Sequence, residues 1–182
     1  MAEQIIDGSG SGNRAHVTDG KQLSVLAATI ELRHHISHTH SKAFCLISQT
    51  TPTGAGSAML YVKNNDSVDL NVWGISLRCA SAECVEIWSV TGTAVGTTNE
   101  PANMVVGSGI KATATTLDGN SITGLTKVKL IKRYWIEAAK QTLHMTIGTA
   151  IILPEGNAIA FYAVTGTALL DLCVSFDFHA VE

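Results

Sequence analysis

The sequence predicts an all-β protein: an antiparallel β-sandwich of the jelly-roll type with an extended N-terminal arm. The chain has 182 residues, of which 46% are hydrophobic and 15% charged, so one domain can bury a real core. β-Branched residues and glycine are plentiful, while charged helix formers are scarce. Short apolar runs also alternate with turn signals along most of the chain, which is typical of a sandwich.

We expect the arm over residues 1–20 and the jelly-roll-like domain over residues 21–182. Glycines alternate with small polar residues in the arm, as in a linker that orders only against a partner. The run from Gly8 to Gly12 is not expected to bind phosphate, because no strand precedes it and no amphipathic helix follows. The candidate partner contacts of the arm are Ile5, Ile6, Asp7 and Arg14.

The apolar runs predict ten strands, at residues 22–33, 43–49, 58–63, 67–79, 84–91, 111–117, 126–136, 142–147, 151–164 and 168–180. The last has the clearest alternation, with Leu172, Val174, Phe176, Phe178 and Ala180 on one face and Asp171, Cys173, Ser175, Asp177 and His179 on the other. In the strand at 67–79 the apolar residues change parity after Gly74, so we expect a β-bulge there.

Turns are expected where Gly, Pro, Asn and Asp interrupt the apolar runs, at residues 51–54, 64–66, 118–120 and 154–156. A helical turn is an alternative within 136–145, since residues 137–141 are good helix formers.

Net charge and cysteine content indicate the class of partner and the redox state of the thiols. The formal net charge of −3 gives no general basic field, so we expect protein partners and neither nucleic acid nor membrane. The four cysteines lack the spacing of a zinc site and are too few for a disulfide framework, so they are expected to be reduced. A bridge between Cys79 and Cys84 stays open as an alternative. With no signal peptide and no apolar span, the chain is expected to be made and kept in the cytoplasm.

Four histidines lie within residues 34–40 and raise the question of a metal site. The cluster falls between two predicted strands, so a solvated loop is the favoured interpretation and no metal or cofactor is expected. His38 and His40 also match the His-x-His of cupins, which are jelly-roll enzymes. The match fails at the remaining ligands: Phe44 and Cys45 stand in the region of the carboxylate, and Ile159 in that of the last histidine.

The arm and the first third of the chain resemble small virion structural proteins of tailed bacteriophages. Residues 6–17 read IDGSGSGNRAHV, matching an arm of the form DG-(T/S)-G-x-G-N-x-A-x-V. They are followed by Leu23-Ser24-Val25, by the strand 60–65, LYVKNN, and by 70–75, LNVWGI. The resemblance implies a non-enzymatic capsid decoration (cement) protein, or another accessory head or tail component, present in the virion and made in the host cytoplasm. It also implies a major capsid protein, or another virion protein, as partner.

Single features of the sequence suggest other functions. Scattered carboxylates, including Glu83 and Glu86, look like turn or outward strand residues, and no nucleophile motif is present. Trp73 and Trp88 have outward parity and could stack on sugar, which makes a carbohydrate-recognising tail or fibre module the alternative and a divergent cupin-like metal enzyme the third hypothesis. Outward Trp73, Trp88 and Cys173 also favour a homo-oligomer, with a trimer preferred by analogy with capsid threefold sites.

The only basic run places Lys127 and Lys129 on one predicted strand face and Val128 and Leu130 on the other. Such a run typically is solvated or protects a sheet edge, and in a minority of proteins it contacts an acidic partner.

Overall fold

The computed structural model describes residues 41–137, 142–166 and 168–178, and the backbone of three short strands nearer the N-terminus. Side chains are described for 41–137, 151–166 and 168–178. The chain divides into two units, Met1–Glu31 and Leu32–Glu182. The boundary expected after residue 20 falls within the first unit.

The first unit contains a small antiparallel sheet in the order β1-β2-β3. Its strands are β1 (Ile5–Ile6), β2 (Arg14–Val17) and β3 (Leu23–Ser24). Ile5 pairs with Ala15 and Ile6 with Arg14, so two of the candidate partner contacts are cross-strand neighbours of each other. The sequence predicted an extended arm and did not anticipate this pairing within it.

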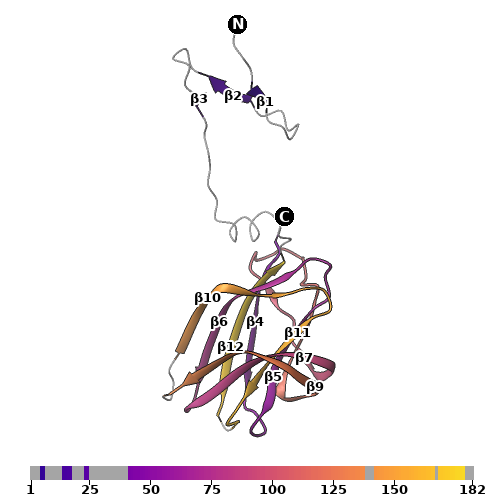
Figure 1. Ribbon diagram of the computed structural model, residues 1–182, viewed down its shortest axis with the longest axis vertical. Helices are drawn as coiled ribbons and strands as arrows, with labels where there is room; N and C mark the ends of the chain where they lie inside the picture. Colours follow the sequence, from indigo (N-terminus) through magenta and orange to yellow (C-terminus); the bar gives the residue numbers. More distant parts are fainter. Residues whose placement is uncertain are drawn as a thin grey trace. The chain divides into compact units, whose positions relative to one another are not determined.

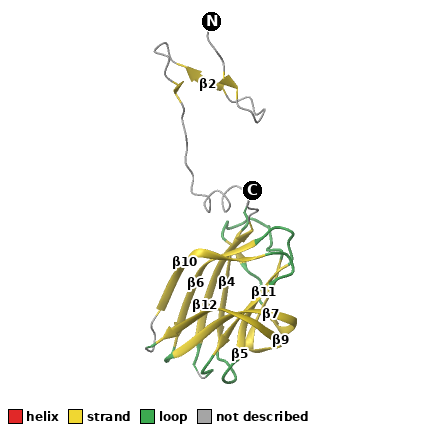
Figure 2. Cartoon of the chain, in the orientation of Figure 1, coloured by secondary structure: helices red, strands yellow, loops and turns green. Residues whose placement is uncertain are grey.

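The second unit consists of strands and loops, and no helix occurs among the described residues (Figure 2). No described helix could therefore span a bilayer. The strands are β4 (Ala43–Thr50), β5 (Ser57–Asn64), β6 (Leu70–Cys79), β7 (Glu83–Thr98), β8 (Ala102–Asn103), β9 (Ala114–Ile136), β10 (Thr142–Leu153), β11 (Ala158–Ala163) and β12 (Leu170–Phe178).

The strand order is that of a jelly roll, as the sequence predicted. One antiparallel sheet has the order β10-β6-β12-β4-β8, and the other strands form a closed barrel β11-β5-β9-β7 (Figure 1). Apart from the short β8, consecutive strands alternate between the two sheets, except that β7 and β9 are neighbours in the same one. This alternation brings the first and last strands of the unit, β4 and β12, side by side.

The main core lies between the two sheets. Its largest fully buried side chains come from both, including Phe44 and Phe176 from the five-stranded sheet and Phe161 and Ile87 from the barrel. A second apolar cluster occupies the opposite face of the barrel strands, where closure of the barrel encloses it. It consists of Ala58, Tyr61, Val90, Leu117, Ile122, Ala158, Ala160 and Tyr162, with Trp88, Ala94 and Leu125 partly buried against them.

The barrel closes through β9, which pairs with β5 as far as Ile122 and with β7 from Leu117 to Ile136. β7 and β9 pair antiparallel, and their backbones nearly touch where the register shifts after Gly92: a Cβ on Gly92 would lie 2.2 Å from the carbonyl oxygen of Gly124. A Cβ on Gly124 would lie 2.0 Å from the carbonyl oxygen of Thr93, and both glycines have positive φ. Only glycine fits at this close approach, so these two residues permit the irregular pairing of β7 with β9.

Two details of the strand pattern are confirmed. Ser175 pairs with Gly74 but Phe176 pairs with Val72, so Trp73 is an extra residue and the predicted bulge is present. Along β12 the described residues alternate as expected up to Phe176, although Asp177, predicted to face outward, is 5% exposed. Residues 179 and 180 lie outside the described residues.

Other boundaries were wrong. The turn expected at 118–120 lies inside β9, which runs unbroken from Ala114 to Ile136. The strands expected at 142–147 and 151–164 are instead β10 and β11, divided by the turn at 154–156. Thr142–Met145 belongs to β10, which removes the helical alternative there, while 138–141 lie outside the described residues.

Candidate interaction surface

The basic run lies on a strand edge. β9 pairs with β7 along most of its length, but β5 pairs with it only as far as Ile122. From residue 123 to 136, the edge of β9 that faces away from β7 has no strand partner among the described residues; we call this stretch the β9 edge. Its exposed side chains include Lys127, Val128, Lys129, Ile131, Lys132, Arg133 and Trp135.

The faces predicted for the basic run were wrong. Trp88 pairs with Leu130, Ser89 with Lys129 and Val90 with Lys127, so Val128 is a bulge residue. Because Trp88 and Val90 share a face of β7, Lys127 and Leu130 lie on that face and Lys129 on the other. Bulges at Val128 and Ile131 therefore shift the alternation, and both side chains are exposed, at 60% and 38%.

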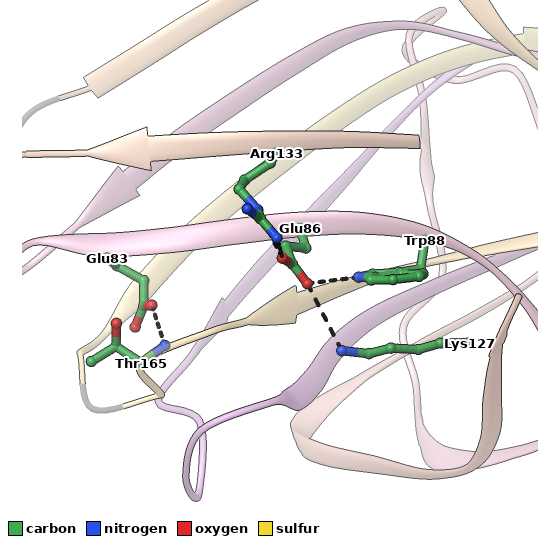
Figure 3. A network of polar contacts seen from close by, with 6 residues as sticks. All are labelled: Glu83, Glu86, Trp88, Lys127, Arg133 and Thr165. Atoms are coloured by element: carbon green, nitrogen blue, oxygen red, sulfur yellow. Dashed lines mark hydrogen bonds and ion pairs between the residues drawn. The ribbon is translucent and has the colours of Figure 1, made fainter. Parts of the chain in front are cut away.

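A buried carboxylate organises the enclosed face of β7 and β9. Arg133, directly opposite Glu86, donates from Nε (2.8 Å) and from Nη2 to Oε1 of Glu86. Trp88 Nε1 donates to Oε2 at 2.7 Å, and Lys127 Nζ lies 3.9 Å from the same oxygen (Figure 3). The Glu86 side chain is 8% exposed, although the sequence predicted an outward residue.

The network keeps Glu86 ionised. Burial alone would raise its pKa, but the hydrogen bonds from Trp88 and Arg133, with the charges of Arg133 and Lys127, lower the pKa below its usual value. The negative charge is thus matched by two cations of β9, Arg133 directly opposite and Lys127 further along the strand.

Lys127 links this network to the aromatic residues of the second cluster. Its Nζ lies 4.0 Å from the ring centroid of Tyr162 and 5.1 Å from that of Trp88. Trp88 is therefore half-buried and engaged, and Trp73 lies on β6 in the other sheet. The two tryptophans do not form the shared sugar-stacking platform that their parity suggested. The tryptophan that the structure exposes most is Trp135, at 65%.

A second buried carboxylate fixes the loop between β11 and β12. Glu83, 2% exposed, accepts a hydrogen bond from the backbone N–H of Thr165 at 2.7 Å (Figure 3). It also accepts from the backbone N–H of Cys84 and of Gly166, each at 2.9 Å. The sequence placed this residue at the surface. The loop also approaches the segment before β5 closely, since a Cβ on Gly166 would lie 1.9 Å from the carbonyl oxygen of Gly54.

The outer face of the five-stranded sheet carries a pair of thiols that sequence reasoning missed. Cys45 on β4 and Cys173 on β12 place their Sγ atoms 3.0 Å apart. Burial, together with the neighbouring thiol of Cys45, raises the pKa of Cys173 to about 12. The two residues are 128 positions apart, so only the strand register reveals the pair. All four cysteines are free, and the Cys79–Cys84 bridge is absent.

The residues considered as metal ligands from the sequence are only partly described by the structure. The histidines of residues 34–40 lie outside the described residues, as does Asp7. Phe44 and Ile159, which stand at the cupin ligand positions, are core residues at 1% and 0% exposure. Within the described part of the chain, no three His, Cys, Asp or Glu side chains gather as a metal site would require.

Comparisons with protein-family models, with curated proteins and with solved structures found no match for the chain.

Proposed function

We propose that this chain is a non-enzymatic structural protein of a tailed-bacteriophage virion, in the role of a capsid decoration protein. The observation that carries the proposal is the arm motif of residues 6–17, which lies in a unit of its own, Met1–Glu31. The jelly roll of the body is compatible with it, since this fold occurs in viral capsid proteins as well as in lectins and cupins.

In this proposal the arm ties the subunit to its neighbours. The sheet β1-β2-β3 has only two or four residues per strand, and a sheet this small is at best marginal in water. A partner that adds a strand to it would supply the missing backbone hydrogen bonds, and pockets would take Ile5 or Ile6. Fully burying both isoleucines contributes on the order of 3–6 kcal/mol before the ordering cost is subtracted. The net free energy of binding per subunit is small, but many copies on one particle would add up to a large stabilisation.

The β9 edge is the surface of the body best suited to a protein partner. It combines open backbone hydrogen-bonding groups with exposed Val128 and Trp135, at 60% and 65%, and with four basic side chains. A partner with an acidic strand would complement the charge and the open backbone groups of the β9 edge. This partner could be a major capsid protein, another virion protein or a second copy of this chain. A homotrimer is the assembly we favour, by analogy with capsid threefold sites.

Deletion of residues 2–14 tests the proposal. The truncated protein should keep the folded body, measured by its thermal unfolding, but should no longer bind particles that lack the protein. The double substitution of Ile5→Ser and Ile6→Ser should weaken attachment in the same way. Ile152→Ser, at a residue 49% exposed on β10, is the matched control and should bind like wild type. A truncated protein that decorates particles as well as the full chain would overturn the role of the arm.

A further inference from the structure

The strongest unassigned feature is the thiol pair on the outer face of the five-stranded sheet. Cys45 lies opposite Ser175 and Cys173 lies opposite Ile47, so the two cysteines are diagonal neighbours on adjacent strands. Their Sγ atoms are already in contact, at 3.0 Å. Both side chains are half-buried and not sealed in the core, and Cys173 borders a shallow depression of about 280 Å³ that Ile47 also lines. Small reagents therefore reach the pair.

We propose that Cys45 and Cys173 form a modification site: a reversible disulfide that staples β4 to β12. The reaction with a small disulfide such as oxidised glutathione proceeds in two exchanges. One cysteine, as thiolate, attacks the glutathione disulfide and releases one glutathione; the second then attacks the mixed disulfide and releases the other. Two protein thiols are oxidised, one disulfide is reduced, and two glutathione thiols carry away the two protons and two electrons.

The position of the staple determines its effect. β4 and β12 are the first and last described strands of the second unit, and they pair along eight positions, from Leu170 opposite Thr50 to Asp177 opposite Ala43. Separating them opens the jelly roll from both chain ends. A bond between residues 128 positions apart closes a very long loop, and closing long loops restricts the unfolded chain most.

The register also determines how easily the bond is reduced. Diagonal partners in an antiparallel pair have Cα atoms roughly 7–8 Å apart, whereas disulfides usually span roughly 4.4–6.8 Å. Forming the bond therefore draws the two strands together, and the strain makes it more reducible than an ordinary structural disulfide. Such a bond would be open in a reducing cytoplasm and closed outside the cell. The inference concerns the body alone and does not depend on the proposed function.

The test is oxidation of the full-length protein in glutathione buffers. The high pKa of Cys173 leaves little thiolate at neutral pH, so incubation should be long and at pH 8.5 or above. Peptide mapping should then show a Cys45–Cys173 bridge with the loss of two hydrogens. The oxidised protein should melt roughly 3–10 °C higher than the reduced protein, and millimolar reduced glutathione should reverse both changes.

Matched variants separate the staple from other thiol chemistry. Cys45→Ser and Cys173→Ser should each abolish the bridge and the oxidation-dependent rise in Tm, whereas Cys84→Ala, at a thiol 1% exposed, should keep both. Glutathione adducts without a bridge, or bridges between molecules, would overturn the site. A bridge that leaves Tm unchanged would overturn the stapling role, and one that resists glutathione would overturn its reversibility.

Discussion

The two sheets share one core, but the faces that they turn away from this core differ in exposure. Among the described residues, the outer face of the five-stranded sheet is partly exposed, with Ile47 65% exposed and the thiols of Cys45 and Cys173 half-buried. The barrel encloses its second face and places there an apolar cluster and the buried carboxylate of Glu86. Polar groups taken out of water must find partners. The enclosed face of the barrel therefore depends on the contacts of Glu86, while on the five-stranded sheet the buried carboxylate of Asp177 accepts a hydrogen bond from Asn71 at 3.2 Å.

Removing Glu83 should cause the largest loss of stability among the substitutions proposed here. Glu83→Ala leaves three backbone N–H groups near the loop between β11 and β12 without their acceptor. We expect the free energy of unfolding to fall by about 3–5 kcal/mol, measured by urea denaturation. Glu155→Ala, at an exposed turn position, is the control and should change it by less than about 0.5 kcal/mol. Equal effects of the two substitutions would show that the carboxylate does not hold the loop.

Neutralising Glu86 should have a smaller effect. Glu86→Gln removes the charge that accepts from Arg133 and Trp88, and we expect a loss of about 2 kcal/mol, because Arg133 is half exposed and can rehydrate. The exposed ion pair of Glu100 with Lys111 is the matched control, and Glu100→Gln should cost less than about 0.5 kcal/mol.

The same network predicts a pH dependence. Because the pKa of Glu86 is lowered in the folded protein, its contribution is complete above the unfolded value of about 4.5 and is lost as pH falls through the folded value. Urea titrations from pH 7 to pH 3 should therefore show a steeper loss of stability in wild type than in Glu86→Gln. Parallel curves for the two proteins would contradict the role of the charge.

The smallest effect is expected on the outer face of the five-stranded sheet. Ile47→Ser, at a residue 65% exposed, should change the free energy of unfolding by less than about 0.5 kcal/mol. Its neighbour Leu46 is fully buried, and Leu46→Ala should cost about 2–5 kcal/mol in the same assay. A large loss from Ile47→Ser would mean that the outer face is part of the folding core.

The alternation of apolar and polar residues in the sequence correctly predicted which side chains of single strands face the core. The parity change around Gly74 gave the bulge at Trp73, and the alternation of the last strand gave the inward residues of β12. The faces of β9 could not be predicted in this way, because the bulges at Val128 and Ile131 arise from its pairing with β7.

Burial of the candidate functional groups depends on contacts between distant segments. Glu83 and Glu86 look like surface residues in the sequence, but Thr165 and Gly166 contact the first carboxylate, and Arg133 and Lys127 of β9 contact the second. Cys45 and Cys173 become neighbours only because the jelly roll pairs its first and last strands. Long-range register is a property of the fold, and one sequence does not display it.

Labelling of purified phage particles tests the central claim most directly. An antibody raised against the body, residues 41–178, would be bound to particles and located by negative-stain electron microscopy. A capsid decoration protein should place the label over the head at many regularly distributed positions. Label confined to the tail or its fibres, or particles without label, would contradict the assignment to the capsid.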